Sequence, residues 1–256
     1  MNPVVAAIVF VGGSIAYAII GVLVGRKIVH RHIREGHNDV LVPLFLTAGV
    51  MYAVLLAFMV VAEWESYDAA SSNAAEEAAI LVPLYRLTPA MAPEPGGKMR
   101  ETIRKYAEDV AEGWDGFAHG ERNRKAGSDA QNMVTIFATM DPANKSREMI
   151  DAQFLENYTQ MVFHRNKRYA QAAESLPWIM WVGAIGGGLI TVGMTFVLYM
   201  ERRTPHIAMA SLMSGMFGLL LFIMALLSRP FLGPLAIQPH PFEATISVFN
   251  DVDHGY

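Results

Sequence analysis

The chain has 256 residues, of which 53% are hydrophobic and only 17% are charged, and its formal net charge is −4. About a quarter of the residues are charged in ordinary soluble domains, so this composition favours a membrane protein. The absence of cysteine excludes disulfides, thiolate metal sites and cysteine nucleophiles, and the negative charge without a large basic domain argues against nucleic-acid binding.

Four stretches contain no Asp, Glu, Lys or Arg, and they cover residues 2–25, 40–62, 175–200 and 204–228. A helix needs about 20 apolar residues to cross the hydrocarbon core of a bilayer. The first stretch lacks a preceding basic region and an evident cleavage site, so we interpret it as a retained helix and not as a signal peptide. The sequence therefore predicts an all-α integral membrane protein with four transmembrane helices.

The charged residues gather between the second and third spans. Residues 63–174 contain 18 Asp and Glu but 13 Lys and Arg, which gives this segment a net charge of −5. We predict an extramembrane helical insert here, and divide the chain into spans one and two (1–63), the insert (64–174), spans three and four (175–229) and a C-terminal tail (230–256).

Helical patterns run through the insert. Span two is expected to continue past the membrane as far as Leu87, and the three prolines and two glycines of residues 88–97 predict a turn. A second helix should cover residues 98–119, and the capping box that starts at Ser128 should open a third, ending near Met140. The fourth is expected to begin at Asp141-Pro142, with an apolar stripe that allows it to run without a break into span three.

Basic residues mark the two short loops between spans. Residues 26–34 and 201–203 together carry six Lys and Arg, while the opposite side carries four, namely Arg165, Lys167, Arg168 and Arg229. Short loops count most in the positive-inside rule, which places both basic loops in the cytoplasm and the insert outside. The alternative topology places the whole insert in the cytoplasm.

An acidic stripe follows span two. Glu63, Tyr67 and Glu77 share one helix face, with alanines between them and Asn73 close by. A carboxylate at the membrane boundary is costly unless it faces water, a cation or a partner, and in a symmetric oligomer Glu63 and Glu77 would form two acidic rings. We predict an ion pathway through these four residues. The alternative interpretation is a solvated helix beyond the headgroups, with Trp64 and Tyr67 as an interfacial belt.

Small residues recur at four-residue spacing in spans three and four. The pairs include Gly183 with Gly187, Ala184 with Gly188, and Ser211 with Gly215. Such faces allow transmembrane helices to approach closely. We predict helix packing at Gly183, Gly187, Gly188 and Gly215, and leave open whether the contacts are within one chain, between copies, or at a mobile helix.

The histidines of the first basic loop are a candidate group of metal ligands. His30 and His32 are spaced i, i+2, which does not place them on one helix face, and His37 lies further along. Contact with anionic lipid headgroups explains this basic loop better. We therefore predict no metal and no cofactor. The sequence also lacks the nucleophile-elbow, P-loop, zinc-protease and dinucleotide motifs, and we expect no enzymatic activity.

The order of these features resembles the bestrophin-like family of bacterial membrane proteins, whose activity is undetermined. The resemblance is carried by residues 56–58, 63–67, 76–78, 84–86, 106–114, 229–233 and 239–242. It implies a four-span membrane protein. Bestrophins proper are pentameric anion channels, but their pore motif is not seen here, and the acidic stripe would favour cations.

Two functions from different classes follow. The first is an oligomeric ion channel, a multi-pass homo-oligomer of the cell inner membrane that passes an inorganic ion, with cations favoured by the acidic stripe. The second is a membrane-anchored sensor or scaffold whose helical insert binds a partner. A membrane metalloenzyme would rest on the scattered histidines alone.

Overall fold

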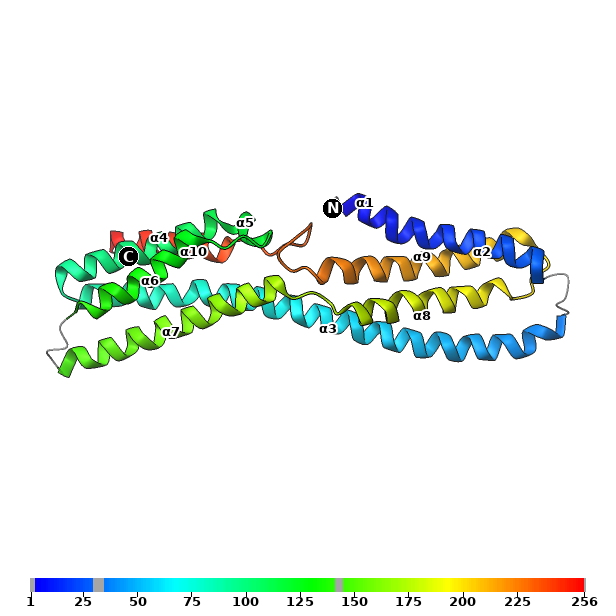
Figure 1. The fold of residues 1–256 in the computed structure, drawn as a ribbon, viewed down its shortest axis with the longest axis horizontal. Coiled ribbons are helices and arrows are strands. Elements are labelled where there is room, and N and C mark those ends of the chain that lie inside the picture. Colours follow the sequence, from blue (N-terminus) through cyan, green and yellow to red (C-terminus); the bar gives the residue numbers. More distant parts are fainter. Residues whose placement is uncertain (1–2, 30–34, 141–144, 256) are drawn as a thin grey trace. The chain divides into compact units, whose positions relative to one another are not determined.

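A computed structural model describes residues 3–29, 35–140 and 145–255 of the chain (Figure 1). Within these ranges the secondary structure is helical and contains no strand. The chain forms two compact units. The membrane unit consists of residues 1–67, 175–229 and 233–235, and the insert unit of residues 68–174, 230–232 and 236–256.

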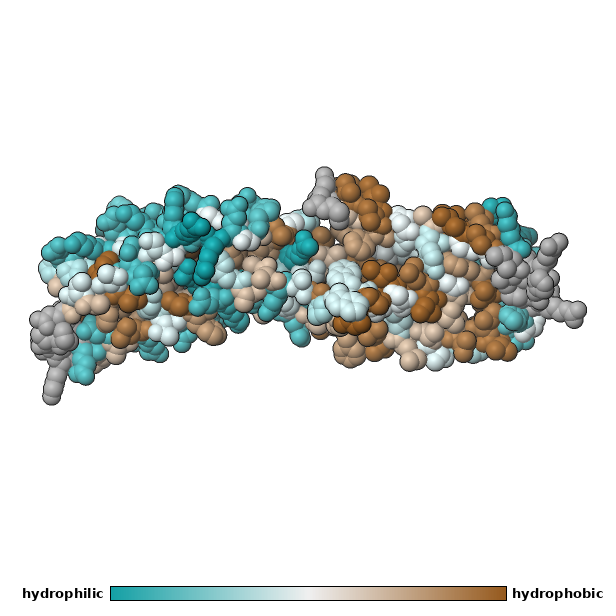
Figure 2. All heavy atoms as spheres, in the orientation of Figure 1, coloured by the Kyte–Doolittle hydropathy of each residue, from teal (hydrophilic) through white to brown (hydrophobic). Residues whose placement is uncertain are grey.

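The described residues contain four helices long and apolar enough to cross a membrane: Val4–Lys27, Asn38–Ala90, Trp178–Phe196 and Arg203–Leu227. The first joins α1 (Pro3–Ala7), a π-helical turn (Ile8–Gly12) and α2 (Gly13–Val29), the second contains α3 (Asn38–Leu87), and the others are α8 (Trp178–Phe196) and α9 (Arg203–Leu227). Figure 2 shows hydrophobic residues over this part of the surface, where a lipid-facing protein needs them, and mainly hydrophilic residues over the insert. The prediction of an all-helical protein with four candidate spans is confirmed.

Close packing of small residues holds the membrane unit together. A Cβ at Gly187 would lie 2.5 Å from the ring of Tyr52, and the Tyr52 hydroxyl donates a 2.6 Å hydrogen bond to the carbonyl of Ala184. On α9, a Cβ at Gly215 would lie 3.4 Å from Ile15. Three of the four predicted packing glycines, Gly187, Gly188 and Gly215, thus have a neighbour from another helix, whereas Gly183 faces open space.

The two short connections between spans lie at the same end of the membrane unit. Arg26 donates hydrogen bonds to the carbonyls of Met200 (2.8 Å) and Glu201 (3.1 Å). The side chain of Asn38 donates to the carbonyl of Tyr199 and accepts from its backbone N–H, both at 2.9 Å. The end of α2 and the start of α3 therefore lie beside the segment between α8 and α9.

In the described residues, the insert unit is built from the last part of α3, from Asp68 onward, and from the helices α4 (Pro93–Glu112), α5 (Trp114–Ala118), α6 (Arg124–Ala138), α7 (Lys145–Ala173) and α10 (His240–His254). Helix α10 packs against α4. Phe249 of α10 stacks on Tyr85 with ring centroids 4.0 Å apart, and Asp253 accepts hydrogen bonds from Tyr85 and Arg104 at 2.8 and 2.7 Å. The C-terminal tail is therefore a helical component of the insert's core, a feature the sequence interpretation missed.

Several predicted boundaries are wrong, and local chemistry explains why. Residues 88–97 are not one turn, because α4 already begins at Pro93, where the missing N–H of proline is tolerated. Gly96 serves close packing instead, since a Cβ there would lie 2.6 Å from the carbonyl of Thr88. The predicted helix over residues 98–119 is interrupted at Gly113, which lies between the end of α4 at Glu112 and the start of α5 at Trp114.

Two helix starts also differ from the predictions. The third insert helix begins at Arg124, and not at Ser128, because the side chain of Asn123 caps it by accepting a 3.1 Å hydrogen bond from Ala126 N–H. Helix α7 does not continue into span three. It ends at Ala173, and α8 begins only after Pro177. The break is explained by this proline, because a proline disfavours helical backbone at the residue before it. The predicted start at Asp141-Pro142 lies outside the described residues.

Candidate functional site

Glu63 lies on the buried face of α3 where the apolar stretch of the helix ends. Tyr52, Leu56 and Met59 precede it at helical spacing, and all three belong to the core of the membrane unit. Only 8% of Glu63 is exposed. Within the described part of the chain it makes no hydrogen bond and no ion pair. A carboxylate on a largely buried side chain is costly unless a cation, a proton or water lies beside it.

Tyr67 follows Glu63 by one helical turn and has a different role in the structure. Its hydroxyl donates a 2.7 Å hydrogen bond to the carbonyl of Leu235, and its ring lies 6.4 Å from that of Trp64. Trp64 is 59% exposed. The tyrosine thus attaches the segment after α9 to α3.

Asn73 forms a polar link inside the insert. Its amide donates a 3.0 Å hydrogen bond to the carbonyl of His164, and its side-chain oxygen lies 2.9 Å from His164 Nδ1. The same nitrogen lies 3.3 Å from a carboxylate oxygen of Glu76. The proton of this imidazole therefore belongs on Nδ1, where both acceptors can receive it.

Glu77 is fully buried and fully paired. Arg168 donates to its two carboxylate oxygens from Nε at 2.7 Å and from Nη2 at 3.0 Å, and the hydroxyl of Tyr106 donates a third hydrogen bond at 2.7 Å. The side chains of Glu77 and Arg168 are 0% and 2% exposed. These contacts differ from those expected of a pore-lining carboxylate, because the charge of Glu77 is already compensated within the insert.

Aromatic rings surround this ion pair. The guanidinium carbon of Arg168 lies 4.4 Å from the ring centroid of Phe117, 5.2 Å from that of Trp114 and 5.8 Å from that of Phe242. Burial raises the pKa of the Tyr106 phenol well above its usual value, and the negative charge of Glu77 adds to the effect. The Glu77–Arg168 pair therefore acts as the polar centre of the insert's core.

Sequence reasoning missed Arg168 and Tyr106 as partners of Glu77. A signal existed, because the predicted apolar stripe of Phe154, Tyr158 and Met161 continues to position 168 at helical spacing. An arginine on a core-facing stripe indicates a buried carboxylate partner.

The four residues of the predicted ion pathway thus have separate surroundings. Glu63 and Tyr67 belong to the membrane unit, and Asn73 and Glu77 to the insert unit. Among the described residues no group of three or more His, Cys, Asp or Glu side chains is placed to hold a metal. His37 is exposed. His30 and His32 lie outside the described residues.

Together, four candidate spans and a helical insert define an all-helical, multi-pass membrane protein. Residues 12–242 match the model of the bestrophin-like domain family, so the chain belongs to that family and the resemblance seen in the sequence is confirmed. Family membership suggests a membrane ion channel-like protein. No curated protein and no solved structure matches the chain.

Proposed function

We propose that this protein is a homo-oligomeric, non-enzymatic ion channel of the cell inner membrane, in which Glu63 attracts and coordinates the permeating cation. The observation that carries the proposal is Glu63 itself, a residue that is only 8% exposed and has no hydrogen-bond or ion-pair partner among the described residues, at the end of an apolar transmembrane stretch. Family membership suggests a channel-like protein and supports the same function.

A cation is a suitable partner for Glu63 on electrostatic grounds. Removing a carboxylate from water is costly, and an opposite charge within about 4–6 Å offsets that cost. Copies of Glu63 brought together around a symmetry axis would repel one another, which a bound cation relieves. Exposed apolar side chains on the spans, such as Phe58 (72% exposed) and Leu212 (72%), are compatible with lipid and with neighbouring copies alike.

The proposal assigns other roles to the remaining three residues of the acidic stripe. The Glu77–Arg168 pair stabilises the insert, and Asn73 links α3 to α7 through His164. Tyr67 attaches the segment that contains Leu235. The proposed conducting path therefore depends on Glu63 far more than on Glu77. The sequence predicts four residues for this path, and of these Glu63 is the one proposed to bind the ion.

Ion flux through the reconstituted protein tests this proposal. Liposomes containing the full chain should release potassium along its gradient, and Glu63→Gln should reduce the flux about tenfold or more, because carboxylate fields raise local cation concentration by such factors. Glu65→Gln is the matched control, since Glu65 is an exposed carboxylate two residues away on the same helix. Equal flux in the two variants would remove Glu63 from the pathway.

A membrane-anchored sensor or scaffold is the second candidate function. The observation that favours it is the insert, which has a buried core of its own, including Tyr106, Met133 and Phe154, and surface cavities. If liposomes that contain the correctly folded wild-type protein pass neither potassium nor chloride, the channel proposal is rejected and the sensor or scaffold role is favoured.

A further inference from the structure

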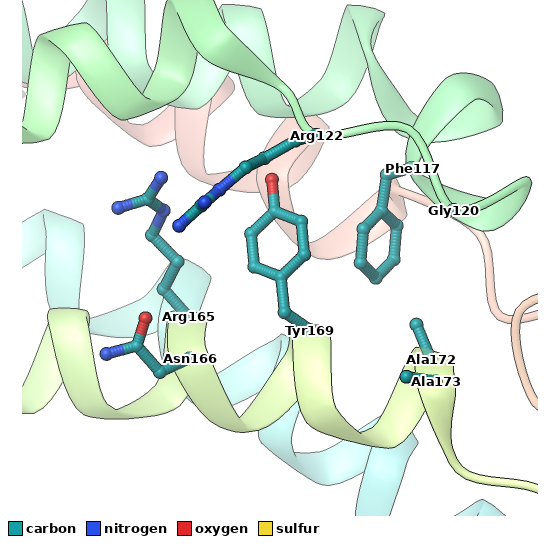
Figure 3. Close-up of a pocket in the computed structure, with 8 residues that line it drawn as sticks. All are labelled: Phe117, Gly120, Arg122, Arg165, Asn166, Tyr169, Ala172 and Ala173. Atoms are coloured by element: carbon teal, nitrogen blue, oxygen red, sulfur yellow. The ribbon is translucent and has the colours of Figure 1, made fainter.

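A cavity of ≈340 Å³ lies in the insert between α7 and the segment that joins α5 to α6 (Figure 3). We call it the arginine cavity, and its wall includes Phe117, Arg122, Arg165, Asn166, Tyr169 and Ala172. The volume is in the range of small-molecule sites, roughly 300–1,000 Å³. No Asp or Glu is among the residues that line it.

The two arginines bring like charges to one end of this cavity. Figure 3 shows Arg122 reaching from its loop toward the guanidinium of Arg165, beside the hydroxyl of Tyr169. Among the described residues neither arginine makes an ion pair with a carboxylate. Two neighbouring guanidinium groups repel one another and attract an anion.

Arg165 also has a donor that no described residue satisfies. Its Nε atom is buried and has no hydrogen-bond partner in the structure. The guanidinium is confined by the backbone of α6, since a Cβ at Gly127 would lie 3.1 Å from its Nη2 atom. Leaving a buried, charged donor unpaired is costly, and a ligand oxygen would satisfy it.

Tyr169 and Asn166 add donors of the same kind. The Tyr169 oxygen accepts a 3.3 Å hydrogen bond from the backbone N–H of Asn123, which leaves its own O–H free to donate. The Asn166 amide is exposed beside it. The polar side of the cavity thus presents donors, whereas Phe117 and Ala172 supply an apolar wall.

An adjoining cavity of ≈400 Å³ shares Phe117 and Arg122 but has an acidic lining that includes Asp109, Glu112 and Glu121. Arg122 is therefore divided between two electrostatic environments. Arg165 lines the arginine cavity and does not line the acidic one. We therefore expect Arg165 to contribute more than Arg122 to anion binding.

We propose that the arginine cavity binds a phosphate group, either as free phosphate or as the headgroup of an anionic phospholipid. The forked guanidinium groups match the tetrahedral oxyanion, and the Tyr169 hydroxyl donates a further hydrogen bond. The site does not depend on whether the membrane unit conducts ions. It gives the insert a ligand-binding role of its own.

The test uses the full chain in phosphatidylcholine nanodiscs, titrated with inorganic phosphate by calorimetry. Arg165→Gln should weaken phosphate binding about tenfold or more, the effect of losing one charge-assisted contact. Arg122→Gln, on an exposed loop that tolerates change, should weaken it less. Lys167→Gln is the matched control, because it removes an exposed charge two residues from Arg165 that does not line the cavity.

A second arm distinguishes the two sources of phosphate. If inorganic phosphate does not bind, nanodiscs containing phosphatidic acid should still raise the thermal midpoint of wild type and of Lys167→Gln, but not that of Arg165→Gln. Binding in the first arm supports a free ligand, and stabilisation in the second alone supports a lipid headgroup. The absence of both effects, or equal losses in Arg165→Gln and Lys167→Gln, overturns the site.

Discussion

Two buried glutamates on one helix illustrate how the membrane unit and the insert differ. Glu77 has three hydrogen bonds and an arginine, while Glu63 has no partner among the described residues. Both side chains are buried and both lie on α3. Their difference comes from what the neighbouring helices supply: α7 presents Arg168 to Glu77, whereas no described side chain offers Glu63 a hydrogen bond or an ion pair.

The same contrast extends to the means by which each unit is held together. In the membrane unit, glycines approach aromatic rings, and hydroxyl groups such as that of Tyr52 donate to backbone carbonyls. In the insert, charged side chains pair among aromatic rings. The paired charges of Glu77 and Arg168 stabilise the fold of the insert. Charged side chains that have no ion-pair partner, such as Glu63 in the membrane unit and Arg165 in the insert, are instead candidates for binding a ligand.

The largest expected effect comes from breaking the satisfied pair. Arg168→Met leaves the Glu77 carboxylate buried without a cation, and removing one partner of a buried pair costs about 3–5 kcal/mol. The insert should lose most of its stability, measured as a lower denaturation midpoint of the full chain in detergent micelles.

A double variant separates charge from volume. Glu77→Gln combined with Arg168→Met removes both charges, and should recover much of the lost stability because no uncompensated ion remains. If the double variant is as unstable as Arg168→Met alone, packing of the arginine among the rings matters more than the charge, and the contrast drawn with Glu63 loses its basis.

A smaller effect tests how the membrane unit is packed. Gly187→Ala places a methyl group against the ring of Tyr52, where a Cβ would lie at 2.5 Å, and overpacking of this kind costs about 1–3 kcal/mol. Gly183→Ala is the control, because nothing lies within 4 Å of a Cβ at that position. The two variants should differ in thermal midpoint in micelles. Equal midpoints would show that α8 adjusts at this contact.

The sequence predicts the spans well because a long uncharged stretch has few alternatives to a membrane helix. It predicts the ends less well, since the start of α6 depends on the cap at Asn123 and the start of α8 on the break at Pro177. Helix α10 was missed because prolines flank its start and its docking depends on Tyr85 and Arg104, which lie far away in the sequence.

The candidate site shows a similar division. The sequence identifies Glu63 and Glu77 as acidic residues on one helix face, which requires only the helical period. It does not distinguish their roles, because the partner of Glu77 lies 91 residues away on α7. The apolar stripe of α7 indicates that Arg168 has a buried acidic partner, but it does not say which carboxylate, because pairing over such separations follows from tertiary packing.

The smallest expected effect concerns a third carboxyl group, Asp129, which interacts with another acid, Asp109, and with Lys105. Burial, and then the adjacent carboxylate of Asp109, raise its pKa to about 6. The unfolded value is about 3.9, so between about pH 4 and pH 6 the folded state binds more protons, and the contribution of Asp129 to stability falls as the pH rises through that window.

Asp129→Asn should therefore stabilise the insert above about pH 6, by about 1 kcal/mol once solvent screening of this partly exposed group is included, and should have little effect near pH 4. Denaturation midpoints of the full chain at both pH values measure the difference, with Asp115→Asn as the control because that side chain is 96% exposed. A gain that does not depend on pH would show that the amide improves packing and that proton binding is not its cause. A gain in stability that is confined to high pH would mean that the carboxylates of Asp129 and Asp109 repel one another in the folded insert. The insert would then contain an unfavourable pair of charges as well as the favourable Glu77–Arg168 pair, and only the charges within the aromatic core would be fully compensated.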